Sequence, residues 1–386
     1  MNDIATTPAP VVSVAPIALT APTRGQDLPI RVSAPTTGRD LPLVVFSHGA
    51  TLDMDDYAPL TRFWAAHGFV VVQPTHLDSL GLASDDPRAP HIWRIRIDDL
   101  TGILDQLDAV EAGVPGLSGR IDREHIAVAG HSWGAQTAST LAGARLLDNG
   151  TPGESMADPR VGAAVLLSLP GTGGADLSPM AAEHFPFMSP NFDNMKTPCL
   201  IVAGDHDHSP LTVRGPDWFT DGYHLAPGAT DLLTLFGAEH GLGGVHGAHD
   251  TRTTDESPER VALVQRTTLA YLRTTLGLDD TAWPAARAAS QQPRSRWAAS
   301  IRSEPDRKDS HLMHPNSADH RRAREYIDQQ DSARRFHPST QLTPSPPLPL
   351  QPFHHHRSYE CAEQQDPARK PSRVAEYPAS AMLAQK

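Results

Sequence analysis

Apolar residues recur along the first 284 residues in short continuous runs, and each run is followed by a loop or by a helical pattern. Runs rich in Val, Leu, Ile and Ala are typical of strands that are buried on both faces of a sheet. They predict strands at 41–49, 69–74, 125–130, 163–170, 198–204 and 231–237.

Between these runs, apolar residues return every three or four positions, which is the spacing of an amphipathic helix. Helices are predicted at 57–68, 92–113, 133–150 and 257–277. The last has clear ends, because Ser257 is a good N-cap, Pro258 suits the first helical position and Gly277 follows the final turn. Strands that alternate with helices predict an α/β fold, with a mostly parallel central sheet covered by helices on both faces.

Both periodicities stop near residue 285. The remaining sequence is rich in Pro, Ser, His and mixed charges, as in the stretch QLTPSPPLPLQPFHHHRS at 341–358. Too little apolar surface is available there to offset the entropy cost of ordering the chain. We therefore expect a low-complexity, disordered C-terminal tail over 285–386.

The charge distribution supports the same boundary. The chain carries a net charge of −12, but the segment after Pro284 contains 16 basic and 11 acidic residues. An acidic chain argues against nucleic-acid binding, which usually requires a basic face. No run approaches the roughly 18 apolar residues of a membrane span. The first 23 residues lack a basic start and an unbroken apolar core, so we expect a cytoplasmic protein; a chain from which a signal had been removed would be secreted.

The sequence GHSWG at 130–134 places a serine between two glycines, directly after an apolar strand and before a helix. The five-residue pattern alone is weak, but a strand–turn–helix context is typical of a nucleophile elbow. Gly130 and Gly134 have no side chain, so the strand and the helix can pass close together while Ser132 takes a strained backbone angle. The sequence therefore predicts that Ser132 is a nucleophile.

Such a serine needs a base and an orienting acid, which follow it in the order Ser, Asp, His in this type of elbow. Asp207 lies three residues past the predicted strand 198–204, with Asp205 as the second choice. His240 follows the predicted strand 231–237 on a glycine-flanked loop. Because ligands meet the carboxyl ends of parallel strands, we expect Ser132, His240 and Asp207 to lie at one edge of the sheet.

An acyl-transfer site also needs two backbone N–H groups that bind the developing oxyanion. One is expected from Trp133, directly after the nucleophile, and the other from Ala50, in the loop after the strand 41–49. His48 is interpreted as a residue that organises this loop rather than as a catalyst. His76, Asp78 and Trp93 follow or flank predicted strand ends, and no role is assigned to them. Substrate-binding residues stay unknown.

These motifs resemble the α/β-hydrolase superfamily, in particular dienelactone-hydrolase-like proteins, platelet-activating-factor acetylhydrolases and cutinase-like polyester hydrolases. The matching segments are VVFSHGA, WAAHGFVVVQPTHLDS, IAVAGHSWGAQTA, TPCLIVAGDHDHSPLT and GAEHGLGG. The resemblance implies a catalytic domain at 25–284, preceded by an extension at 1–24 and followed by the tail. It also implies the Ser132–Asp207–His240 triad, with the amides of Ala50 and Trp133 as the oxyanion hole.

Other functions compete with this one. Histidines and aspartates are dense between residues 205 and 250, and imidazole and carboxylate suit zinc or manganese, so a metal-dependent hydrolase is the second hypothesis. The possible ligands are Asp205, His206, Asp207, His208, His240, His246, His249 and Asp250. A non-catalytic binding protein on a hydrolase fold is the third. Peptidase or thioesterase activity would use the same triad.

We predict a serine-dependent carboxylic ester hydrolase that acts through an acyl-enzyme on small to medium acyl esters, with no cofactor and no metal. A polyester (cutinase-like) or lipid ester hydrolase with the same triad is the alternative within this class. The expected partner is a small-molecule or polymeric ester. The sequence does not predict the oligomeric state. The segment 171–195 either caps the site, with Phe185, Phe187 and Met188 lining it, or packs within the domain.

Overall fold

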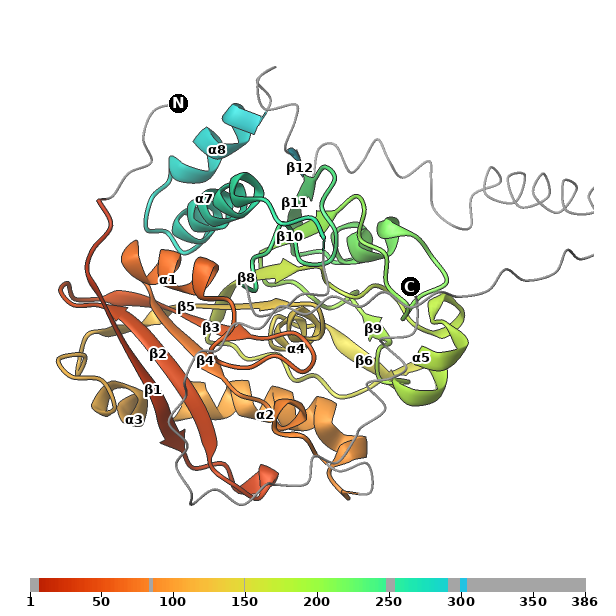
Figure 1. Ribbon diagram of the computed structural model, residues 1–386, viewed down its shortest axis with the longest axis horizontal. Coiled ribbons are helices and arrows are strands. Elements are labelled where there is room, and N and C mark those ends of the chain that lie inside the picture. The colour runs from red at the N-terminus through yellow and green to blue at the C-terminus, as the bar shows by residue number, and fades with distance from the viewer. Residues whose placement is uncertain (1–6, 83–85, 149, 248–253, 291–298, 304–386) are drawn as a thin grey trace, which may run out of the picture. The chain divides into compact units, whose positions relative to one another are not determined.

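The computed structural model describes residues 7–82, 86–148, 150–247, 254–290 and 299–303. Their centre is a nine-stranded sheet in the order β1-β2-β4-β3-β5-β8-β10-β11-β12 (Figure 1). Its six inner strands, from β4 to β11 in this order, are mutually parallel, whereas β1, β2 and β12 pair antiparallel at the two edges. The strands are β1 (Val11–Leu19), β2 (Leu28–Pro35), β3 (Leu41–Ser47), β4 (Val70–Pro74), β5 (Ile121–His131), β8 (Val161–Leu167), β10 (Cys199–Gly204), β11 (Ala229–Leu235) and β12 (Ala299–Ser303).

Helices cover both faces of the sheet, as the alternation of strands and helices predicted (Figure 1). They are α1 (Ala58–Ala66), α2 (Ile92–Asp105), α3 (Leu107–Ala112), α4 (Trp133–Leu141), α5 (Pro179–His184), α6 (Asp221–Leu225), α7 (Pro258–Thr275) and α8 (Ala282–Ser290). Successive residues of a strand point to opposite faces, so Val44 and Phe46 pack with α1 and α7, while Leu43 and Val45 pack with α2 and α4. The α/β fold is confirmed.

Two predicted helices are shorter than expected. The pattern over 92–113 is divided between α2 and α3, which meet at Gln106. The helix predicted over 133–150 ends at Leu141, and the chain continues into β6 (Arg145–Asp148), which pairs with β7 (Thr151–Pro152) and β9 (Pro190–Asn191) in a small second sheet. Gly143 has a φ of 111° between helix and strand, a conformation that favours glycine.

The sheet extends past the limits expected from the sequence. Strand β1 lies within the expected extension 1–24, and α8 continues past residue 284. Strand β12 lies within the expected tail and pairs with β11, from Asp231 opposite Ser303 to Leu235 opposite Ala299. From residue 304 onward, the predicted tail lies outside the described residues. No helix in the described part of the chain is long and apolar enough to cross a membrane.

Candidate active site

Strand β5 ends directly before Ser132, and α4 begins directly after it. Ser132 has φ 56° and ψ −124°, an unusual conformation for a residue with a side chain. The flanking glycines permit this turn. A Cβ on Gly130 would lie 2.2 Å from the carbonyl oxygen of Gly134, and one on Gly134 would lie 2.0 Å from that of Ser47. The chain therefore has the tight strand–turn–helix geometry that the motif predicted.

Substitution of Gly134 by alanine is expected to lower the free energy of unfolding by about 3 kcal/mol, because the methyl group must displace the backbone of β3. Gly102 in α2 provides the control, since a Cβ there meets only the Gln106 amide nitrogen at 3.8 Å. Gly102→Ala is expected to stabilise the helix slightly. Urea denaturation measures both. Equal stability of the two variants would contradict the close approach at the elbow.

The structure brings Ser132, His240 and Asp207 together in one hydrogen-bonded chain. The Nδ1 atom of His240 lies 3.0 Å from both carboxylate oxygens of Asp207, and its Nε2 atom lies 2.9 Å from Ser132 Oγ. A carboxylate only accepts hydrogen bonds, so Nδ1 carries the proton and Nε2 of the neutral ring accepts from the serine hydroxyl. The Asp207 side chain is fully buried, whereas that of His240 is 35% exposed. The imidazole is thus oriented by a buried carboxylate while the ring itself is partly exposed.

The second-choice acid lies elsewhere. Asp205 is exposed and accepts a hydrogen bond from the Gly237 amide at 2.6 Å. It therefore shapes the turn after β11, while Asp207 faces the imidazole.

In the loop after β3, the amides on the two sides of Ala50 are both hydrogen bonded, each to a different side chain. The Gly49 N–H donates to Tyr57 Oη at 3.0 Å, and the Thr51 N–H donates to Asp78 Oδ2 at 3.2 Å. The structure gives neither the Ala50 nor the Trp133 N–H a hydrogen-bond acceptor among the described residues. These are the two amides that the sequence predicted for the oxyanion hole.

His48 contacts the backbone of this loop and of the strand end beside it. Burial, and next the nearby Arg96 charge, lower the pKa of His48 to about 3, so its ring is neutral. Its Nε2 accepts from the His76 amide at 3.0 Å, and its Nδ1 donates to the Gly49 carbonyl at 2.7 Å. These bonds agree with the interpretation of His48 as a loop-organising residue.

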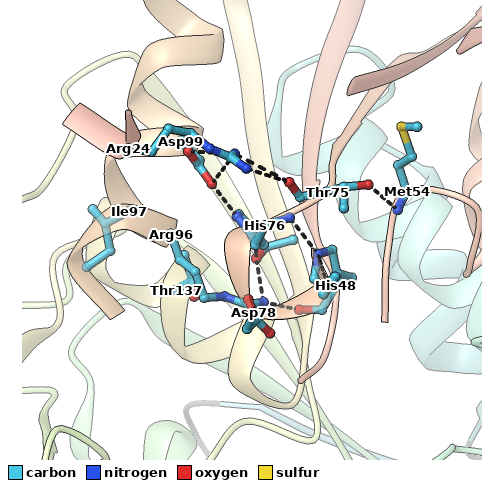
Figure 2. Close-up of polar contacts among 12 residues, drawn as sticks. Arg24, His48, Met54, Thr75, His76, Asp78, Arg96, Ile97, Asp99 and Thr137 are labelled. Carbon is cyan, nitrogen blue, oxygen red and sulfur yellow. Dashed lines mark hydrogen bonds and ion pairs between the residues drawn. The ribbon is translucent and has the colours of Figure 1, made fainter. Parts of the chain in front are cut away.

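His76, to which no role was assigned, is part of a buried polar network behind the loop (Figure 2). Burial holds the pKa of His76 well below its usual value. Its Nδ1 donates to Asp99 at 2.8 Å and its Nε2 accepts from Ser47 Oγ at 2.9 Å. Arg24 donates to the same carboxylate at 3.1 Å, which ties the segment after β1 to helix α2. The network fixes the strand ends that carry the site.

Sequence reasoning missed Tyr57 and His131, which connect two parts of the site. His131 Nε2 lies 2.7 Å from the His240 carbonyl oxygen, so this nitrogen carries the proton and donates it. The Nδ1 atom of His131 then accepts from Tyr57 Oη at 2.8 Å, and that hydroxyl in turn accepts from the Gly49 N–H. No periodicity in the sequence signals this connection, because it joins residues that are far apart along the chain.

The predicted metal ligands between 205 and 250 do not gather in the described part of this segment. Asp207 faces His240, and His246 has its Nδ1 atom 3.0 Å from the Gly247 carbonyl oxygen. His249 and Asp250 lie outside the described residues. Among the residues that the structure describes, no group of three or more His, Cys, Asp or Glu side chains is arranged to hold a metal ion.

The segment 171–195 contributes an aromatic side chain beside the elbow. The Phe187 ring stacks on that of Trp133, with a centroid distance of 5.2 Å, and Phe185 packs edge-on against Phe187. Both phenylalanines are half-buried, whereas Met188 is buried in the core. Met188 therefore packs within the domain, and Phe187 lies next to a residue of the candidate site.

Comparison with known families gives one match. Residues 10–149 match the family model described as Chlorophyllase, over a region that includes the loop after β3 and the elbow. No curated protein matches the chain. The family match, together with the fold, confirms the resemblance to α/β-hydrolases and supports an ester hydrolase in general.

Proposed function

We propose that this α/β-hydrolase is a serine-dependent carboxylic ester hydrolase that works through an acyl-enzyme. The proposal depends above all on one observation, the hydrogen-bonded chain from Asp207 through His240 to Ser132 at a strained turn. A base within hydrogen-bond distance of a serine, itself oriented by a buried carboxylate, is the arrangement that activates a hydroxyl nucleophile.

In the first half of the reaction, Ser132 Oγ forms a bond to the ester carbonyl carbon while its proton passes to His240 Nε2. The carbonyl oxygen becomes an oxyanion that accepts hydrogen bonds from the amides of Ala50 and Trp133. Collapse breaks the bond to the alcohol oxygen, which leaves with the proton from His240. Asp207 stabilises the imidazolium and keeps its orientation throughout.

In the second half, His240 takes a proton from water as the water oxygen attacks the acyl carbon. The second tetrahedral intermediate collapses, the bond to Ser132 Oγ breaks, and His240 returns the proton to that oxygen. The products are a carboxylic acid and the free serine. This chemistry uses no cofactor and no metal.

Support for Ala50 comes from its neighbours. The amides of Gly49 and Thr51 are both hydrogen bonded, which fixes the loop while leaving the amide between them for a ligand. Donors that are held in place before the reaction need no reorganisation as charge develops, and this is the main source of their effect.

The substrate class proposed is an ester with a small to medium acyl group, and a polyester or lipid ester is the alternative. The matched family is described as Chlorophyllase, a name that denotes activity on chlorophyll and is consistent with the alternative of a larger ester. Because Phe187 is half-buried and stacks on Trp133, its ring is our candidate for a side chain that limits the acyl group.

Replacement of Phe187 by alanine is expected to move the optimum of a p-nitrophenyl ester series, from acetate to palmitate, toward longer chains. Removal of the ring opens space beside the elbow, and each CH₂ that finds apolar contact contributes about 0.8 kcal/mol. Phe63→Ala, on the surface helix α1, is the control. An unchanged optimum in Phe187→Ala would assign the ring to packing alone.

A chelator and an organophosphate distinguish the serine mechanism from the metal-dependent alternative. Hydrolysis of p-nitrophenyl esters by the wild-type protein should be unaffected by a chelator and lost on stoichiometric reaction with an organophosphate, with the label on the peptide that contains Ser132. Activity that a chelator removes and the organophosphate leaves intact would instead support a metal site.

A further inference from the structure

Arg96 is a buried cation on the inner face of helix α2, which is apolar apart from Arg96 and Asp99. It lies on α2 at the spacing of Ile92 and Leu100, and its side chain is completely buried. Its Nη1 atom donates to both carboxylate oxygens of Asp78, at 2.9 and 2.8 Å. A buried charge requires such a partner, because its desolvation is costly. The other contacts of Arg96 show what this ion pair holds.

The ion pair contacts the loop after β3 on both sides of Ala50. Arg96 Nη2 donates to the His48 carbonyl (Figure 2), and Asp78 Oδ2 accepts from the Thr51 N–H. His48 and Thr51, which flank Gly49 and Ala50, are therefore hydrogen bonded to Arg96 and Asp78, the two members of one ion pair. The ion pair thus holds the backbone on both sides of the Ala50 amide.

The same guanidinium contacts the indole ring of Trp133, the residue whose backbone N–H is the second proposed oxyanion donor. Its central carbon lies 4.6 Å from the ring centroid of Trp133, within the distance of a cation–π contact. The Nε atom of Arg96 has no hydrogen-bond partner among the described residues. Arg96 thus touches the loop of Ala50 through hydrogen bonds and the start of α4 through its flat face.

We propose that Arg96, paired with Asp78, is the positioning residue of the oxyanion hole, fixing the Ala50 and Trp133 amides relative to each other. The inference rests on the proposed function. Arg96 acts through other residues and does not touch the substrate. Oxyanion donors act only at the place where charge develops, and a displacement of about 1 Å costs about 100-fold in rate. Lysine cannot replace the arginine, because it lacks the planar fork that serves both hydrogen-bond partners and the aromatic face.

The test compares Arg96→Lys and Asp78→Asn with wild type. Arg94→Lys is the matched control, since Arg94 lies on the same helix and is 42% exposed. In both test variants, kcat for p-nitrophenyl butyrate should fall about 10- to 100-fold while KM stays within about 3-fold. Inhibition by an alkyl trifluoromethyl ketone, whose adduct with serine carries an oxyanion, should weaken by the same factor as kcat/KM. Inhibition by the product acid butyrate should not change.

Melting temperatures separate positioning from general damage. The inference is overturned if Arg96→Lys and Asp78→Asn keep wild-type kcat and ketone affinity, or if kcat, KM and butyrate inhibition all change together with the melting temperature. If Arg96→Lys does not fold, Asp78→Asn alone provides the test. A selective loss of kcat and ketone affinity in that variant supports the inference, and wild-type values overturn it. A wild-type protein that neither hydrolyses the ester nor binds the ketone would refute the proposed function itself, a result distinct from a defect in the variants.

Discussion

Replacement of Ser132 by alanine is expected to lower kcat for p-nitrophenyl butyrate by about 10⁴-fold or more, with the protein still folded. The hydroxyl oxygen is the only non-hydrogen atom removed, and it forms the 2.9 Å hydrogen bond to His240 Nε2. Without it, no acyl-enzyme forms, and the residual rate reflects only the oxyanion amides and the base acting on water. Alanine also keeps the turn, since the neighbouring glycines provide the space.

Ser139 offers a matched control on α4, the helix that follows Ser132. It is fully buried, and its hydroxyl donates to the Gln136 carbonyl at 2.7 Å, away from His240. Ser139→Ala is expected to keep kcat within about 3-fold. Steady-state kinetics with active-site titration of each preparation measures the difference. Ser132→Ala with near-wild-type turnover would refute the serine mechanism.

The second large effect is expected from Asp207→Asn, which should lower kcat about 10³- to 10⁴-fold. Both carboxylate oxygens lie 3.0 Å from His240 Nδ1 and keep the proton on that nitrogen. An amide at this position can donate to Nδ1, which favours the wrong tautomer and removes the negative charge that stabilises the imidazolium. The side chain is fully buried, so water cannot replace the lost charge.

Asp205→Asn is the control for this prediction, because Asp205 lies two residues away and bonds the Gly237 amide instead of the imidazole. It should keep kcat within a few-fold, since an asparagine oxygen still accepts from that amide. The comparison measures kcat of both variants between pH 6 and 9. Circular dichroism verifies that each variant is folded. Equal losses of kcat in both variants, or a larger loss in Asp205→Asn, would contradict the assignment of Asp207 as the residue that orients His240.

The parallel sheet and the order of the site residues follow from local patterns. Ser132, Asp207 and His240 each lie two or three residues past a predicted strand. Parallel strands bring their carboxyl ends to one edge, so local signals predicted that these residues meet. Strand β12 was not predicted, because the sequence ASIRS gains its partner only from β11 and lies in a polar region. Helix α4 ended early for a similar reason, since β6 gains its pairing from β9, more than 40 residues later.

The supporting residues around the site depend on tertiary contacts that periodicity does not report. Tyr57 and His131 are 74 positions apart and meet through one hydrogen bond. Arg96 could be recognised from the sequence, because a charged residue among the mostly apolar buried positions of a predicted helix requires a buried partner. That partner, Asp78, lies in the loop after β4, and only the fold shows which segments the pair contacts.

The proposed mechanism requires an acyl-enzyme on Ser132, and the most direct test is to trap it. Wild-type protein is mixed with excess p-nitrophenyl butyrate, quenched in acid within the first turnovers, digested and analysed by mass spectrometry. We expect one butyryl group on the peptide that contains Ser132, formed in step with a burst of p-nitrophenol, and neither adduct nor burst in Ser132→Ala. Rapid turnover with no acylated peptide at any quench time, in a reaction that a chelator stops, would contradict it.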